Sequence, residues 1–245
     1  GYIDTDMVAA VPEEELGKIV AKIPVGRLGQ AEVGQQRPVD RAHVAAGVLE
    51  PHASPAGGPV EGVAVGVGAD LINDTWAGAD PDLVGVAAEE GVGIVCSHTG
   101  GATPRTRPHR VRYTDVVADV VAEVTAAAEK AVAAGVRTDS ILIDPTHDFG
   151  KNTYHGLELL RRVDVLVNTG WPVLMALSNK DFIGETLGVE LADRLEGTLA
   201  ATALAAAGGA RMFRVHEVAS TRRVVDMVAA IQGTRLPRRT TRGLA

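Results

Sequence analysis

The sequence predicts an α/β fold built on a parallel sheet, because short apolar segments alternate with longer helical patterns from about residue 68 onward. The strand candidates are LIND (71–74), GIVCSH (93–98), ILID (141–144), PVLMALS (172–178) and RMFRVH (211–216). Each interval between them is long enough to hold a connecting helix. This spacing is typical of a (β/α) barrel or of an open doubly wound sheet, and the residues alone leave both architectures open.

The helices expected between the strands are clearest at residues 115–134 and 190–207. In the first, Thr114 is the expected N-cap, Gly135 the expected end, and one apolar face is formed by Val117, Val120, Val121, Val124, Ala128 and Val132. The second is rich in Ala and Leu and stops at Gly208.

The sequence has no G-x-G-x-x-G after a strand, which argues against a dinucleotide-binding site. It also has no P-loop and no nucleophile elbow.

The N-terminal third has a different character. Between Tyr2 and Trp76 there is no aromatic residue, and residues 34–66 are rich in Gly, Pro and Ala with weak periodicity. Such a composition is typical of a linker. We therefore divide the chain into an atypical segment at 1–66, with its linker-like part at 33–66, an α/β portion at 67–235 and a solvated basic tail at 236–245. The absence of an initiator Met suggests a fragment or a processed end.

Composition narrows the environment and the partners. The 245 residues carry a net charge of −7, which argues against broad nucleic-acid binding. Cys96 is the only cysteine, so an intrachain disulfide is excluded and a reducing compartment is favoured. No apolar run reaches membrane-spanning length and no signal peptide is visible. We expect a cytoplasmic protein that contacts neither nucleic acid nor membrane.

Polar residues end the predicted strands on one face. Side chains alternate along a strand, and in four strands the apolar member comes first and the polar member last. The pairs are Leu71 with Asn73, Leu142 with Asp144, Ala176 with Ser178, and Met212 with Arg214 and His216. Lys180 and His98 follow two of the strands. In a parallel barrel these residues converge at the carboxyl rim, where active sites lie.

The convergent residues predict binding of a heterocycle that bears phosphate. A carboxylate and an amide match the donor and acceptor edge of a heterocycle, and Arg214 two residues before His216 makes an anion clamp. Simpler readings exist: Asp144 before Pro145 as a turn former, Asn73 as turn chemistry, His98 as a structural histidine, and Arg214 and His216 as strand-end polar residues. Their convergence favours a site. Neither a Ser-His-Asp triad nor a Cys/His metal cluster is apparent.

Residues 69–232 resemble the C-terminal two thirds of dihydropteroate synthase, a pterin-binding enzyme of folate biosynthesis. The stretches that carry the resemblance are ADLINDTWAG, IVCSHTGG, LIDPTHDFGKN, VLMALSNKDFIGETLG and RLEGTLAATALAAAGGARMFRVHEV. They are most similar to the divergent second paralogue found in actinobacteria. The resemblance implies a TIM-type (β/α)₈ barrel that is incomplete, with strands 4–8 recognisable and strands 1–3 not.

The resemblance also implies an activity and a set of roles. The family condenses p-aminobenzoate with 6-hydroxymethyl-7,8-dihydropterin diphosphate and releases pyrophosphate with the help of Mg²⁺. By resemblance, three groups carry the chemistry: Asn73, Asp144 and Lys180 for the pterin, Ser178 and Phe149 for the aminobenzoate side, and Arg214 and His216 for the diphosphate. Lys180, Arg214 and His216 would be catalytic. The family's dimers use late helices, so a homodimer is expected.

The chain departs from the family pattern in ways that lower the expected activity. Thr146-His147-Asp148 replaces a Gly-rich aromatic loop, and Asn179 stands where the family commonly has Arg. The first three family strands have no counterpart, and with them go the metal-side Asn and a second pterin Asp. The resemblance therefore leaves open an alternative, a catalytically inactive pterin-binding paralogue or truncated remnant, and it predicts no metal ligand.

A second resemblance concerns the N-terminus. Residues 1–32 resemble the C-terminal part of a short-chain dehydrogenase/reductase, close to acetoacetyl-CoA reductases, and Thr5 matches a cofactor-contacting Thr. That family's Gly-rich cofactor loop and catalytic residues are absent. An NAD(P)-dependent reductase fragment is therefore the weaker alternative. We interpret the chain as a composite that joins this fragment to the synthase-like portion.

Overall fold

The computed structural model describes residues 43–45, 69–101 and 112–242. The chain divides into two compact units, Gly1–Val39 and Asp40–Ala245, and all described residues belong to the second. The reductase-like segment at 1–32 and most of the linker-like segment at 33–66 lie outside the described residues, so their assignments remain predictions. In the described part of the chain, no helix is long and apolar enough to cross a membrane.

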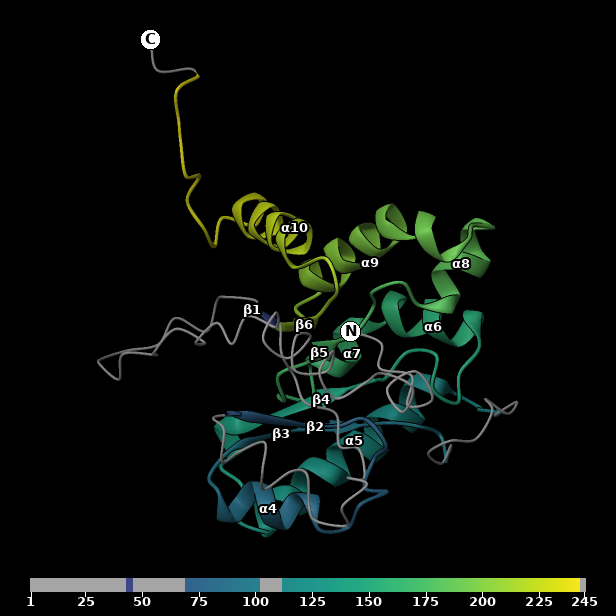
Figure 1. Cartoon of the computed structure of the whole chain (residues 1–245), viewed down its shortest axis with the longest axis vertical. Coiled ribbons are helices and arrows are strands. Elements are labelled where there is room, and N and C mark those ends of the chain that lie inside the picture. Colours follow the sequence, from purple (N-terminus) through teal and green to yellow (C-terminus); the bar gives the residue numbers. More distant parts are fainter. Residues whose placement is uncertain (1–42, 46–68, 102–111, 243–245) are drawn as a thin grey trace, which may run out of the picture. The chain divides into compact units, whose positions relative to one another are not determined.

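The described strands are all parallel (Figure 1). One sheet has the order β2-β3-β4 and the other has the order β1-β6-β5. A parallel bridge between Ile143 and Val173 joins β4 to the start of β5, so the strand order runs β2-β3-β4-β5-β6-β1. The strands are β1 (His43–Ala45), β2 (Leu71–Asp74), β3 (Gly93–Ser97), β4 (Ile141–Asp144), β5 (Leu174–Met175) and β6 (Met212–Arg214).

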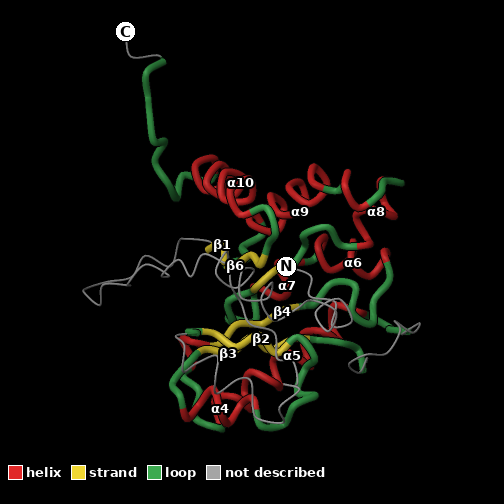
Figure 2. Tube along the Cα trace, in the orientation of Figure 1, coloured by secondary structure: helices red, strands yellow, loops and turns green. Residues whose placement is uncertain are grey.

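Helices follow the strands in the alternation that the sequence predicts (Figure 2). Helix α4 packs against β2 and β3, helix α5 packs against β3 and β4, and helices α9 and α10 pack together. The helices are α4 (Leu83–Glu89), α5 (Val116–Ala133), α6 (Thr153–Arg161), α7 (Val163–Val167), α8 (Asp181–Leu187), α9 (Leu195–Ala207) and α10 (Val218–Ile231). The prediction of an α/β fold with parallel strands is therefore confirmed.

Helix α5 confirms the predicted helix at 115–134 but corrects its details. The N-cap is Asp115, not Thr114, since the Asp115 carboxylate accepts hydrogen bonds from the backbone N–H groups of Val117 and Ala118. Val132, which was expected on the buried face, is 38% exposed because the buried stripe of the helix runs through Val124, Ala128 and Ala131, and Val132 lies one position beyond it. Val121 is only partly buried.

Gly135, which follows the end of α5, has a φ of +106°, a conformation that residues with a Cβ rarely adopt. We expect Gly135→Ala to lower the free energy of unfolding by about 1–2 kcal/mol, because the native backbone there is strained for L-residues. The same change at Gly85, exposed in α4 with open space around it, should instead stabilise the chain by up to about 1 kcal/mol. Urea denaturation of both variants measures the two shifts, and a Gly135→Ala variant as stable as the parent would contradict the prediction.

Two apolar clusters lie on opposite faces of the strands. The larger one packs between strands and helices and includes Phe213, Ile143 and Val124. The smaller one contains the strand residues that the sequence places on the other face: Leu71, Val95, Leu142, Leu174, Ala176 and Met212. The first apolar member of each predicted strand pair therefore lies in this smaller cluster, as the alternation rule requires.

Strand β1 is a finding that the sequence did not predict. It lies inside the segment interpreted as a linker, and it pairs in parallel with β6 through the register His43↔Met212 to Ala45↔Arg214. A three-residue strand leaves almost no periodic pattern to detect, and its backbone hydrogen bonds do not depend on side-chain type. The described chain therefore has six strands where the sequence indicated five.

Candidate functional site

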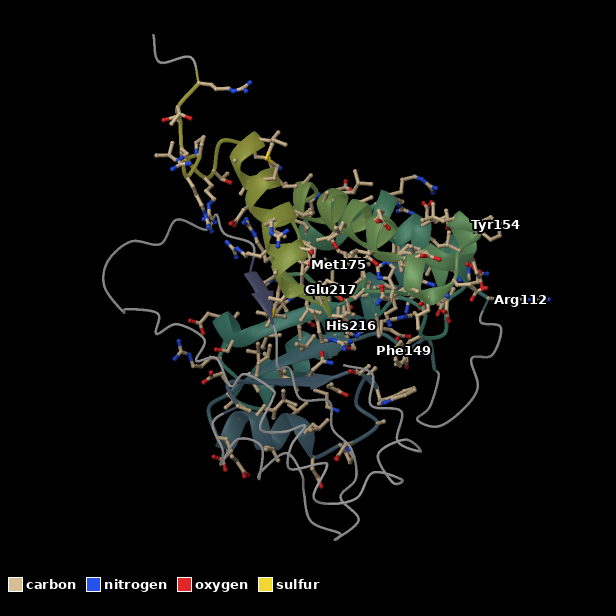
Figure 3. All side chains as sticks on the ribbon, turned by 45° about the horizontal axis from the view of Figure 1, so that its top comes forward. Arg112, Phe149, Tyr154, Met175, His216 and Glu217 are labelled. Atoms are coloured by element: carbon tan, nitrogen blue, oxygen red, sulfur yellow. The ribbon has the colours of Figure 1, made fainter. Side chains whose placement is uncertain are left out.

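The residues predicted at the rim end their strands on a common face. In the register of β2, β3 and β4, Asn73 pairs with Val95, and Ser97 pairs with Asp144. Paired residues of parallel strands point to the same side, so Asn73 and Asp144 project from the face that carries the smaller apolar cluster. Both are buried. Phe149 and His216, which come from segments after β4 and β6, lie beyond the strand ends in Figure 3.

Asp144 is the centre of the site. It is fully buried at the end of β4, and its Oδ1 accepts a hydrogen bond of 2.7 Å from the backbone N–H of Thr146. Burial raises the pKa of Asp144, and the positive charges of three nearby residues oppose that rise: Arg214, Lys180 and Lys151. Three cations from three different segments therefore face one buried carboxyl group.

Two aromatic rings lie next to Lys180, one of the cations that act on Asp144. The Lys180 ammonium lies 5.0 Å from the centroid of the Phe149 ring, which is a cation–π distance. The Phe149 ring in turn meets Trp76 edge to face, with centroids 5.0 Å apart. Loops after β2, β4 and β5 contribute these three side chains. The Phe149 ring therefore lies between a positive charge and a second aromatic ring.

Hydrogen bonds join the loops that follow β5 and β6. The backbone N–H of His216 donates to Ser178 Oγ at 3.2 Å, and Asn179 Nδ2 lies 3.4 Å from His216 Nδ1. Asn179 has a φ of +56°, which Asn tolerates better than most residues. Burial lowers the pKa of His216, and Arg214 and Lys180 shift it in the same direction. The structure therefore brings Ser178, Lys180, Arg214 and His216 together as predicted.

His98 does not join this set. Its backbone lies at the end of β3, but its ring turns toward α5, where Nε2 lies 2.8 Å from Asp119 Oδ1. The expectation that the His98 side chain lies at the rim is therefore wrong. The residue follows β3 by one position, so its ring falls on the face that packs against helices rather than on the face of Ser97.

The sequence reasoning missed Lys151. Its ammonium is buried and donates to three backbone carbonyls, those of His98 at 2.9 Å, Phe149 at 3.0 Å and Thr146 at 3.2 Å. Burial lowers the pKa of Lys151 to about 7, and the Asp144 carboxylate acts against that shift. A lysine in a polar loop is normally exposed, so the sequence offered no signal for this role.

The loop that departs from the family pattern is anchored internally. Asp148 Oδ2 accepts a hydrogen bond of 2.6 Å from the backbone N–H of Asp181, so it caps the start of α8. His147 is buried against the Phe182 ring, with centroids 5.3 Å apart, and burial lowers its pKa to about 3. Thr146 and Asp148 both have positive φ values. These residues fix the loop that carries Phe149.

Two buried polar atoms on the rim face, Asn73 Oδ1 and Ser97 Oγ, have no hydrogen-bond partner within the described part of the chain. Asn73 donates from Nδ2 to Thr75 Oγ1 at 2.5 Å, but its Oδ1 accepts no hydrogen bond there. Buried polar atoms are nearly always paired in native proteins, by a ligand or a water where the protein offers nothing. Asn73 Oδ1 is therefore an acceptor that a ligand donor can satisfy.

The described rim residues do not fit Mg²⁺. This ion prefers oxygen ligands, chiefly carboxylates and waters, in an octahedral arrangement. At the end of the site that holds Arg214 and His216, the neighbouring charges are positive, and Asp144 already faces three cations. We therefore derive no step that involves a magnesium ion.

Comparison with known proteins gives a consistent result. The family model described as pterin binding enzyme matches residues 59–216. The chain is 74% identical over 182 residues to "Inactive dihydropteroate synthase 2" of Mycobacterium leprae (strain TN), covering 73% of this chain and 62% of that protein. The protein of the same name in Mycobacterium tuberculosis (strain ATCC 25618 / H37Rv) is 71% identical over 186 residues, covering 74% and 58% respectively. The chain therefore spans about six tenths of the length of these curated relatives.

Solved structures agree with these matches. The structure of Mycobacterium tuberculosis Rv1207 matches with a TM-score of 0.59 and 57% identity, covering 78% of this chain and 70% of that chain. Dihydropteroate synthase from Thermus thermophilus in complex with 4-aminobenzoate matches with a TM-score of 0.67 and 38% identity, covering 74% of this chain and 69% of that one.

Proposed function

Because the chain belongs to the family of pterin-binding enzymes, we propose that it binds a pterin at its strand ends and does not catalyse dihydropteroate synthesis. The family supports a dihydropteroate synthase-like protein of folate biosynthesis, which is the main reading of the sequence. The identities of 74% and 71% to proteins named inactive dihydropteroate synthase 2 favour the alternative, an inactive pterin-binding paralogue. Likeness to solved synthases further supports the inference that the parallel strands belong to a TIM-type barrel.

The observation that carries the proposal is the buried Asp144 carboxyl group at the strand ends. A pterin presents an amino group and ring N–H groups along one edge, and a carboxylate accepts hydrogen bonds from such donors. Asn73 Oδ1, which is buried without a partner in the described residues, supplies a second acceptor on the same face. Lys180 over the Phe149 ring provides an adjacent charge and a flat surface.

The aminobenzoate side is where we expect function to be lost. Ser178 Oγ already accepts from the backbone of His216, and Asn179 next to it places no positive charge where the family commonly has Arg. A carboxylate ligand there would find one cation fewer, and a charge-assisted hydrogen bond is about twice as strong as a neutral one. By resemblance to the family, Arg214 and His216 would hold a diphosphate, so we expect the chain to bind the pterin diphosphate even though it does not turn it over.

We also propose a homodimer formed through the late helices. Three large apolar side chains are strongly exposed on α9 and α10: Leu204, Met227 and Ile231. Such side chains are commonly covered by a second subunit when they gather on one surface. Analytical ultracentrifugation of the full chain measures the oligomeric state.

The buried thiol of Cys96 favours a reducing compartment such as the cytoplasm.

The decisive experiment separates binding from turnover. We expect calorimetry with 6-hydroxymethyl-7,8-dihydropterin diphosphate to give saturable one-site binding, and pyrophosphate release in the presence of p-aminobenzoate to stay at background. An active dihydropteroate synthase assayed in parallel is the control. Pyrophosphate release at that enzyme's rate would show that the chain is an active synthase. Failure to bind the pterin would show that it is a truncated remnant without pterin-binding function. The reductase alternative predicts NAD(P)H consumption with acetoacetyl-CoA, which we do not expect.

A further inference from the structure

A second polar cluster lies between the end of β3 and α5, and it contains none of the residues proposed to bind the pterin. It consists of His98, Asp119 and Glu123. His98 Nε2 lies 2.8 Å from Asp119 Oδ1 and 3.4 Å from Glu123 Oε2. Asp119 and Glu123 are four residues apart on α5, so their carboxylates lie on one face of the helix, one turn apart. One imidazole nitrogen and two carboxylates therefore converge.

The His98 ring is restrained by burial, and its Nδ1 has no hydrogen-bond partner within the described part of the chain. Its side chain is fully buried, its backbone N–H donates to Thr146 Oγ1 at 3.2 Å, and its carbonyl accepts from Lys151. Tyr113 packs near the ring, with centroids 5.9 Å apart. The two carboxylates are by contrast about half exposed, with side chains 44% and 54% accessible. The cluster thus combines one buried nitrogen donor with two adjustable oxygen donors that face solvent.

The charges around the cluster favour a cation. Asp119 and Glu123 bring two carboxylates to the same imidazole nitrogen. The nearby Lys151 ammonium, which donates to the His98 carbonyl, offsets only one of these two negative charges.

We propose that His98, Asp119 and Glu123 form a three-ligand surface site for a divalent transition metal ion, of which Zn²⁺ is the best match. A mixed imidazole and carboxylate set suits this ion, which often takes three protein ligands and an open position for water. With metal–ligand bonds of about 2.0–2.2 Å, tetrahedral ligands lie roughly 3.4 Å apart. The separations of 2.8 and 3.4 Å from His98 Nε2 therefore need only small side-chain adjustments. This site does not depend on the proposed pterin function.

A titration of the full chain with Zn²⁺ in chelator-free buffer tests the site. We expect calorimetry to show one equivalent bound, and X-ray absorption at the zinc edge to show only nitrogen and oxygen ligands at about 2.0–2.2 Å. The double variant Asp119→Asn/Glu123→Gln should weaken binding at least about tenfold. Both residues are half exposed, so the variant should remain folded, whereas replacing the buried His98 could unfold the chain.

The matched control is Glu129→Gln, which removes one negative charge from an exposed position of the same helix outside the cluster. It should bind Zn²⁺ like the parent. Equal affinity in the parent and the double variant would overturn the proposal, because the ion would then be bound by other residues. The absence of one-equivalent binding to the parent, or a sulfur ligand in the absorption spectrum, would overturn it as well.

Discussion

Replacing Asp144 with Asn is expected to weaken pterin binding by about 100-fold or more. The variant side chain has the same shape, but one of its two oxygens becomes an NH₂ donor. That donor would face the donors of the pterin, and a lost hydrogen bond to a charged group costs about 1.5–3 kcal/mol. Arg214, Lys180 and Lys151 would in addition lose the favourable interaction with the Asp144 carboxylate. Calorimetry and pterin fluorescence quenching provide the measurement.

The control for this prediction is Asp193→Asn, which removes a carboxylate from an exposed position in the turn Leu191–Asp193 before α9. Its pterin affinity should equal that of the parent. Because Asp144 is buried, urea denaturation should first establish that the Asp144→Asn protein is folded. Asn73→Ser offers a second route, with a milder loss of about tenfold, since it removes the neutral amide acceptor together with the Nδ2 donor to Thr75. Parent-like binding by Asp144→Asn would refute the assignment of Asp144 as the pterin acceptor.

Strands β2 and β4 were predictable to the residue because each is a short apolar run that ends on a polar residue. The alternation within each run also predicted which side chains share a face, and the register of Asn73, Val95 and Leu142 agrees with it. Strand β1 could not be predicted, since three residues of weak pattern carry no period. Its existence depends on backbone pairing with β6, a non-local interaction that the sequence does not display.

The site residues whose side-chain direction follows from strand alternation could be predicted, and those whose contacts depend on loop conformation could not. Arg214 and Lys180 act electrostatically on Asp144, as expected for residues at the same strand ends. His98, one residue past the end of β3, points instead to Asp119 on α5, and the sequence cannot reveal a partner 21 positions away. Lys151 was overlooked for a related reason, because burial of a lysine depends on carbonyls brought together by two separate loops. Local pattern carries no information about such convergence.

The second large expected effect is the loss of stability when the buried Lys151 ammonium is removed. Lys151→Met should lower the free energy of unfolding by about 2–4 kcal/mol, because it leaves the buried carbonyls of His98, Thr146 and Phe149 without their shared donor. Removal of a buried charge recovers part of its desolvation cost, so the loss stays below the sum of three charged hydrogen bonds. Urea denaturation measures the change, and hydrogen exchange should show loss of protection first in the loop from Thr146 to Lys151.

Lys130→Met is the matched control, since it removes the same charge from an exposed position in the last turn of α5. Its stability should stay within about 0.5 kcal/mol of the parent. If Lys151→Met were as stable as the parent, the cost of burying the ammonium would equal everything its hydrogen bonds contribute. In that case the loop would be held by other interactions, such as the cap that Asp148 places on α8. A clear loss of stability would instead show that the Lys151 hydrogen bonds hold the loop after β3 and the loop after β4 together.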